Sequence, residues 1–150
     1  HGNILYFSHP VFRHYRAYGA VICREFVVKA IRAFLGNTIT LSTNLPSTAR
    51  VTLMKRPNEN RYVLHLLYAP TVTRGGVFQL SGGKVSGGQS VEVIEELPPL
   101  CDVEVRLRLP VRSAILVPQG GAIPIKTFGD HVSLCLPTLS CHQMIELHVH

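Results

Sequence analysis

The sequence contains no tryptophan, and phenylalanine and tyrosine together make up only 7% of its 150 residues. Domains that bind sugars usually present aromatic rings that stack on the pyranose ring. Three of the five tyrosines, Tyr6, Tyr15 and Tyr18, fall in a segment with a helical pattern, where they are expected to pack. Tyr62 and Tyr68 alone keep a carbohydrate-binding role open, so it is the weaker alternative.

Long apolar runs and a leader pattern are also missing. No run approaches the ~20 residues that span a bilayer, and the first residues lack the basic region and cleavage site of a signal peptide. We therefore expect no membrane partner. The compartment is left open between cytoplasm and periplasm.

The four cysteines form no CxxC pair, and each lies among apolar neighbours. This pattern favours buried thiols over disulfides or a metal site, and it fits a chain that tolerates a reducing compartment. Cys23 and Cys135 are expected to be small buried groups, so replacing either one with alanine should lower the free energy of unfolding by about 1–3 kcal/mol.

The formal charge of +6 permits an acidic partner, but the basic residues between Arg13 and Lys126 never cluster in groups larger than two. A nucleic-acid partner is therefore not predicted. The run Gly82–Gly88 superficially resembles a phosphate-binding loop. It lacks the Walker pattern, because Val85 follows Lys84 and no helical pattern comes next. We predict a mobile surface loop over residues 81–88 and no cofactor.

The first part of the chain is patterned as helix. Asn3–Phe7 is expected to be a buried strand, with Ser8 or His9 as the N-cap of a short helix that ends at Gly19. A second helix over Ala20–Leu35 ends at Gly36. Its apolar stripe comprises Cys23, Phe26, Val27, Ala30, Ile31 and Phe34, opposite Arg24, Glu25, Lys29 and Arg32. One strand and two helices cannot form a sheet layer, so residues 1–36 are interpreted as the C-terminal end of a truncated α/β domain.

Residues 37–150 are patterned as β-strands. The apolar runs Val51–Met54 and Tyr62–Tyr68 flank a turn, and the second run is apolar enough to predict a central strand buried on both faces. Asp102–Leu109 alternates, with Val103, Val105, Leu107 and Leu109 pointing inward. Further strands are expected at Thr38–Leu41, Ser90–Ile94, Ala114–Val117, Ile123–Phe128, His131–Leu136 and Met144–Val149. The chain is therefore predicted to be mainly β: an antiparallel sandwich of about seven or eight strands after a short α/β segment.

The eight histidines raise the question of a metal site. Glu146, His148 and His150 share one face of the last predicted strand, just after Cys141-His142. A metal site also needs a third ligand, held in place by a hydrogen-bond partner, and no such residue can be named from the sequence. We therefore predict a polar outer face and no metal site. His65, within the apolar run, is expected to be a hydrogen-bonded interior or interface histidine and not a catalytic base.

The segments Val117–Gly120, Ile123–Asp130, Val132–Pro137 and His142–Leu147 resemble the C-terminal β-sandwich of many glycoside hydrolases. Ile4–Gly19, the amphipathic helix and Arg61–Pro70 resemble a junction in bacterial β-galactosidase-like and α-L-fucosidase-like enzymes. There a catalytic TIM barrel comes first, an amidotransferase-like trimerisation domain second and the sandwich last. The resemblance implies that this chain ends the second domain and contains the third. It also implies an upstream barrel as partner, a possible homo-oligomer, and contact with oligosaccharide only through the parent enzyme.

Glycoside hydrolysis uses two carboxyl groups on either side of the scissile bond. No acid in this chain has the apolar setting that would suit it as a general acid, and the resemblance places the catalytic carboxylates in the missing barrel. We therefore predict no catalytic residue in the chain. Any enzymatic activity is expected to belong to the longer parent protein. The acids surveyed are Glu25, Glu59, Glu92, Glu95, Glu96, Asp102, Glu104, Asp130 and Glu146.

The predicted function is that of a non-catalytic accessory domain, which supports the catalytic barrel or the oligomer. The alternative is a stand-alone β-sandwich that binds carbohydrate or a polyanion, suggested by the charge of +6. Salt-dependent affinity for polyanions would favour that alternative. The sequence does not specify the sugar, the linkage or the oligomeric state.

Overall fold

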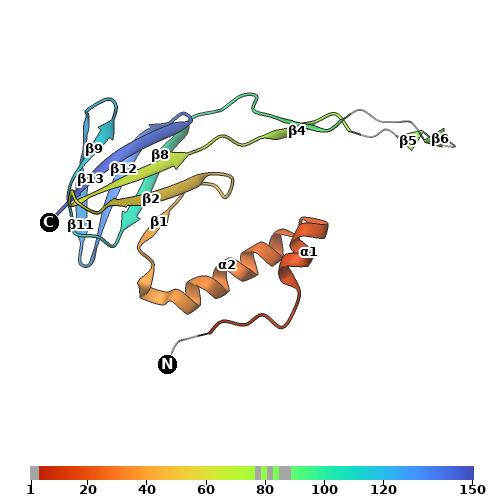
Figure 1. Cartoon of the computed structure of the whole chain (residues 1–150), viewed down its shortest axis with the longest axis horizontal. Coiled ribbons are helices and arrows are strands. Elements are labelled where there is room, and N and C mark those ends of the chain that lie inside the picture. The colour runs from red at the N-terminus through yellow and green to blue at the C-terminus, as the bar shows by residue number, and fades with distance from the viewer. Residues whose placement is uncertain (1–3, 77–78, 81–82, 85–88) are drawn as a thin grey trace. The chain divides into compact units, whose positions relative to one another are not determined.

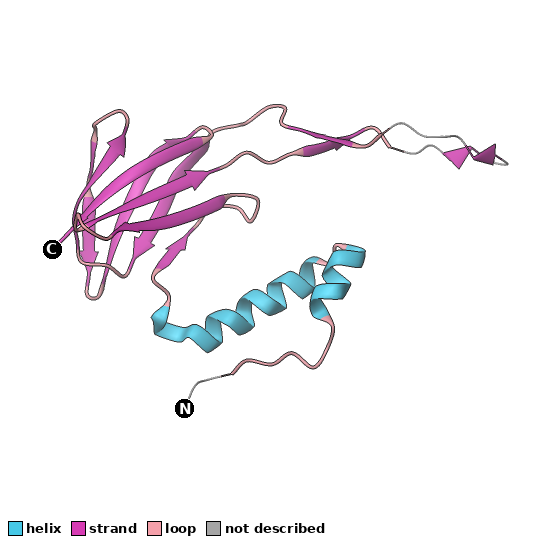
Figure 2. Cartoon of the chain, viewed as in Figure 1, coloured by secondary structure: helices cyan, strands magenta, loops and turns pink. Residues whose placement is uncertain are grey.

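A computed structural model describes residues 4–76, 79–80, 83–84 and 89–150 of the chain. The chain divides into two compact units, His1–Thr40 and Leu41–His150. The first is helical and the second consists of strands (Figures 1 and 2). The domain boundary expected between residues 36 and 37 lies four residues before this division and stays a prediction.

The first unit contains α1 (Val11–Tyr18), α2 (Val21–Leu35) and the short 3-10 helix η1 (Gly36–Thr38). Both predicted helix ends are confirmed. Gly19 and Gly36 have φ angles of 63° and 50°, which a residue without a Cβ adopts at little cost. The predicted N-cap is wrong, because Pro10 caps α1 without a side-chain hydrogen bond. The Ser8 hydroxyl instead lies 3.1 Å from the imidazole of His9.

The strand predicted at Asn3–Phe7 is also wrong for the part that the structure describes. Ile4–Phe7 belong to no helix or strand, because the described residues of the first unit offer no second strand with which to form a ladder. Phe7 instead packs edge-to-face against Phe12 and Phe26, each at 5.9 Å between ring centres. The two helices contain no buried residue.

The second unit is an antiparallel β-sandwich, as predicted. Its four-stranded sheet has the order β1 (Leu41–Thr43), β8 (Leu100–Leu107), β12 (His131–Leu139), β11 (Ile125–Phe128). Its five-stranded sheet has the order β10 (Ala122–Ile123), β9 (Val111–Val117), β13 (His142–Val149), β3 (Arg61–Leu67), β2 (Arg50–Arg56). Two further pairs join β4 (Val72–Arg74) to β7 (Val91–Val93) and β5 (Gln79–Leu80) to β6 (Gly83–Lys84).

The core lies between the two sheets and is built by alternation along the strands. Apolar residues at every second position are buried along β8, β3 and β13, and along β12 as far as Leu136, as the period-two rule requires. The predicted hairpin of β2 and β3 is confirmed, and so are the inward positions of β8. The buried apolar residues are Leu64, Leu66, Val103, Val105, Leu107, Val111, Ala114, Ile123, Val132, Leu134, Leu136, Leu139, Ile145 and Leu147.

The prediction that β3 is buried on both faces is wrong. Leu64 and Leu66 are fully buried, whereas Val63 and His65 are half-buried and Leu67 is exposed. β3 does lie inside its sheet, between β13 and β2. A two-layer sandwich covers only one face of each sheet, so an apolar strand can still leave its other face open.

Several predicted strand boundaries are also wrong; for example, β9 begins three residues before the predicted Ala114, and β8 ends at Leu107 and not at Leu109. Ile123–Phe128 is two strands, because the chain passes from the five-stranded to the four-stranded sheet at Pro124, which has no N–H to donate. β12 continues through Pro137 to Leu139. A 3-10 turn takes residues 36–38, so the strand predicted at Thr38–Leu41 begins only at Leu41.

The burial predicted for the cysteines is partly wrong. All four are free; Cys101 and Cys135 are exposed, whereas Cys23 and Cys141 are half-buried. Cys135 lies on β12 between the inward Leu134 and Leu136, so its thiol is on the outer face. The stability loss predicted for Cys135→Ala is therefore not expected.

Two further sequence predictions concern the loop at residues 81–88 and membrane-spanning segments. The loop predicted at residues 81–88 falls largely outside the described residues. Neither of the described α-helices is both long and apolar enough to cross a membrane.

Candidate functional site

The outer face of the five-stranded sheet carries a depression of about 630 Å³. Its side chains come from β2, β3, β13 and β9, whose registers bring together residues distant in sequence. Met144 of β13 lies opposite both His65 of β3 and Val117 of β9, and Met54 of β2 lies opposite Val63. The depression therefore lies where four neighbouring strands present the side chains that do not face the core.

The floor of this depression is apolar and its edge is charged. Met54 is 56% exposed and shares the lining with Val63, Val117 and Met144. The edge comprises Lys55, Arg56, Pro57, Arg61, His65 and Glu146. No tryptophan, tyrosine or phenylalanine is among these described lining residues, so the depression has no ring on which a sugar could stack.

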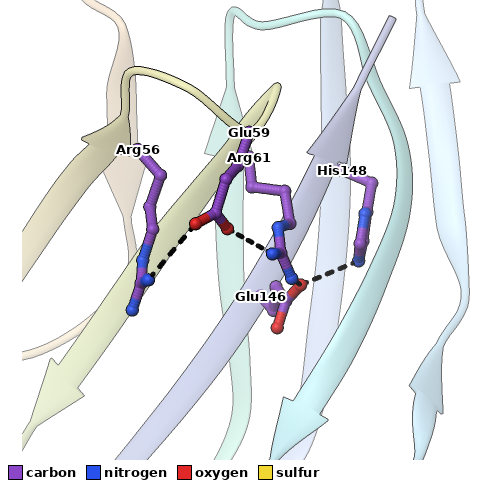
Figure 3. A network of polar contacts seen from close by, with 5 residues as sticks. All are labelled: Arg56, Glu59, Arg61, Glu146 and His148. Carbon is purple, nitrogen blue, oxygen red and sulfur yellow. Dashed lines mark hydrogen bonds and ion pairs between the residues drawn. The ribbon is translucent and has the colours of Figure 1, made fainter.

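A network of ion pairs includes three of the lining residues, Arg56, Arg61 and Glu146 (Figure 3). Arg61 donates one guanidinium N–H to Glu146 Oε1 at 2.5 Å and another to Glu59. Arg56 lies 3.7 Å from Glu59, and His148 Nε2 lies 3.1 Å from Glu146 Oε1. The network links the β2–β3 turn to β13, two segments that are more than eighty residues apart in sequence.

Arg61 determines the protonation state at the centre of this network. Its hydrogen bond holds the pKa of Glu146 below the ordinary value of 4.5, against partial burial, which acts in the opposite direction. The same hydrogen bond raises the pKa of Arg61. Glu146 is therefore ionised at neutral pH and accepts hydrogen bonds from its neighbours. It is not a proton donor.

This lowered pKa makes Glu146 a pH-dependent contributor to stability. Since its pKa is lower in the folded state, the contribution is fully present above about pH 4.5 and is lost as the pH falls through the folded value. Glu146→Gln should lower the urea midpoint at pH 7 and flatten the decline in stability below pH 4.5. Urea unfolding at several pH values measures this effect.

The matched control for Glu146→Gln is Glu96→Gln, an exposed carboxyl for which the described residues provide no ion pair. This variant should follow the unmodified chain at every pH. If Glu146→Gln also follows it, the Arg61–Glu146 pair contributes nothing to stability.

A histidine pair lies on the same outer face. His65 Nδ1 and His142 Nε2 are 3.2 Å apart, and the rings stack with centres 5.4 Å apart and planes inclined by 19°. The predicted hydrogen bond of His65 is confirmed, whereas the predicted interior position is wrong, because His65 is half-buried on the outer face. His65 and His142 are 77 positions apart, so only the pairing of β3 with β13 brings them together.

The residues considered for a metal from sequence do not come together in a single cluster. Glu146 and His148 belong to the ion-pair network, His150 is exposed at the chain end, and His142 contacts His65. Within the part of the chain that the structure describes, no group of three or more His, Cys, Asp or Glu residues could hold a metal ion.

Three other acids, Glu95, Glu104 and Asp130, serve as ion-pair partners. Glu95 binds Arg74 through both oxygens at 2.6 and 2.7 Å, and Glu104 accepts from Arg106 and from Ser133 at 3.1 Å. Hydrogen bonds from Arg74, Arg106 and His131 respectively lower the pKa of Glu95, Glu104 and Asp130. Lowered pKa values are the opposite of what a general acid in glycoside hydrolysis requires.

The first unit has a second candidate surface, on its helices. The apolar stripe predicted on α2 is only partly covered within this unit, since Cys23, Val27 and Ala30 are half-buried. Its members Phe26, Ile31 and Phe34 are exposed, and Ile22 and Tyr6 nearby in sequence are more exposed still. Contiguous apolar surface of this kind marks sites of contact with other protein.

Comparison with known proteins relates the chain to a solved structure. The chain is similar to the solved structure of alpha-L-fucosidase isoenzyme 2 from Paenibacillus thiaminolyticus, with 39% sequence identity and a TM-score of 0.79. The match covers 93% of this chain but only 20% of that chain, so this chain spans about a fifth of the length of the protein it matches. No protein-family model matches the chain, and no curated protein does.

Proposed function

We propose that this chain is a non-catalytic, C-terminal part of a glycoside hydrolase of the α-L-fucosidase type. The observation that carries the proposal is the 39% identity over 93% of the chain to a fifth of a fucosidase. An identity of that size over nearly the whole chain supports common ancestry. The small share of the fucosidase that is matched leaves room there for a separate catalytic domain.

The chemistry of the described residues supports the absence of catalysis. The carboxyl groups with a shifted pKa are all shifted downward and held by cationic partners or histidine. Among its described lining residues, the depression on the outer face has a single acidic side chain, Glu146, which Arg61 engages. A glycosidase needs a second carboxyl group on the far side of the bond.

The accessory role that we propose is support of the catalytic domain or of an oligomer. The uncovered apolar surface of α1 and α2 supports this role, because a helix stripe of this kind is normally buried against another layer. In the parent enzyme, the rest of an α/β domain or a neighbouring subunit would cover it. The sandwich contributes a stable core with its own hydrophobic interior.

Two measurements test the proposal. The reading frame upstream of residue 1 should encode a barrel domain with paired carboxylates, and the isolated chain should not hydrolyse aryl α-L-fucosides or related aryl glycosides. Turnover by the isolated chain that is abolished by mutating one of its own acids would overturn the non-catalytic assignment. An upstream frame that encodes no hydrolase domain would overturn the parentage.

A second candidate function is the binding of an anionic polymer by the outer face of the five-stranded sheet. Lys55 and Arg56 lie side by side on the edge of the depression, and the chain carries a charge of +6. Affinity for a sulfated polysaccharide should then fall steeply with salt, and Lys55→Gln/Arg56→Gln should weaken it. A response that is flat with salt would exclude this candidate.

A further inference from the structure

The histidine pair on the outer face of the sandwich has the spacing of a metal chelate. Two metal–imidazole bonds of about 2.0–2.1 Å that meet at 90–110° place the two nitrogens about 2.9–3.4 Å apart. His65 Nδ1 and His142 Nε2 are 3.2 Å apart, within that interval. Imidazole nitrogens are ligands that divalent zinc, copper and nickel prefer.

The surroundings of the pair allow a metal ion to approach. His142 is exposed and His65 is half-buried, so the ion can keep water molecules as its remaining ligands. Met144 lies directly opposite His65 and lines the same depression, and its polarisable thioether is a ligand for soft metals. Each ring has a second nitrogen for which the described residues show no hydrogen bond, so the rings can turn without losing one.

We propose that His65 and His142 form a site for a divalent transition-metal ion that links β3 to β13. The ion replaces the N–H···N hydrogen bond with two metal–nitrogen bonds, and the donor ring changes tautomer. Its proton moves through solvent to the other nitrogen of the same ring, so both imidazoles stay neutral. Because β3 and β13 pair inside the five-stranded sheet, such an ion would stabilise the folded sandwich by binding it in preference to the unfolded chain. This inference does not depend on the proposed function.

The test uses the full chain, freed of any polyhistidine tag, and Ni²⁺ alone as the probe. Ni²⁺ follows Cu²⁺ in affinity for nitrogen ligands, and free thiols do not reduce it. Titration calorimetry should show one bound ion that His65→Gln and His142→Gln each weaken by at least about tenfold, since one imidazole cannot chelate. The double variant should bind no more weakly than either single variant.

The matched control is His148→Gln, which removes a histidine from the same face of the same strand. His148 is engaged with Glu146 at 3.1 Å, so this variant should retain the bound ion. The ion should also raise the melting temperature of the unmodified chain and of His148→Gln, but not that of His65→Gln. Binding should weaken on acidification, because only neutral imidazole coordinates a metal.

Three outcomes would overturn the proposal: no binding of Ni²⁺ by the unmodified chain, binding that both His65→Gln and His142→Gln retain, or binding that His148→Gln loses equally. If a variant does not fold, the imidazole ¹⁵N signals of the unmodified chain decide the matter with Zn²⁺, a diamagnetic ion. Zn²⁺ should shift the signals of two histidines together. Signals that stay unchanged exclude the site.

Discussion

Replacing Leu64 with alanine is expected to lower the free energy of unfolding by about 2–5 kcal/mol. Leu64 has 0% exposure and lies on β3 between β13 and β2, where its side chain faces the core. Truncation removes apolar contacts and leaves a cavity that neighbours on two sheets cannot fill. A domain of this size has only about 5–15 kcal/mol to lose, so the effect is large.

The same strand provides the control for this experiment. Leu67 lies three positions further along β3, on the opposite face, and is 36% exposed. Leu67→Ala makes the same chemical change and should cost no more than about 1 kcal/mol. Urea unfolding followed by far-UV circular dichroism measures both values. Equal losses for the two variants would mean that the core does not lie between the sheets.

The second large effect is expected at the helical start of the chain. Phe26 on α2 is 55% exposed and packs edge-to-face against Phe7 at 5.9 Å. At the concentrations of a sedimentation experiment, the isolated chain should hide this apolar surface by self-association, which we favour over folding back. Phe26→Glu places a charge in that surface, so it should disperse the oligomers or unfold the helices while the β core stays intact.

Sedimentation velocity and the helical signal in circular dichroism measure the outcome for Phe26→Glu. Val28→Glu is the control, because it adds the same charge at an exposed position four residues from both Arg24 and Arg32, on the polar side of α2, and should leave both readings unchanged. An unmodified chain that sediments as a monomer would contradict the self-association. A Phe26→Glu chain that keeps both the oligomer and its helical signal would contradict burial of the stripe.

Local patterns in the sequence predicted most of the elements. Gly19 and Gly36 end the two helices because both adopt positive φ angles. The burial of Val103, Val105 and Leu107 could be predicted, because the alternation of apolar and polar residues along one strand is visible in the local sequence. Predictions for individual residues were wrong where the position of a residue depends on a strand that lies elsewhere in the sequence. The strand at Asn3–Phe7 had no neighbour with which to pair, and Pro124 marks a change of sheet that periodicity does not reveal.

The candidate site could not be predicted in the same way. Arg61 and Glu146 are 85 positions apart, and His65 and His142 are 77 apart. Each residue by itself looked like a polar position on a strand. Their chemistry arises because β3 and β13 pair in one particular register, and a shift of one residue would turn each histidine into the core.

The sequence by itself determined the order of elements, the choice of helix or strand for most of them, the β-sandwich class and the resemblance to glycoside hydrolases. These depend on local propensity and on periodicity, which act over a few neighbouring residues. Only the tertiary structure decided that β3 has one open face, that two thiols are exposed and that Arg61 engages Glu146. Those properties depend on which strands lie side by side, and hydrogen bonds between segments many residues apart fix that arrangement.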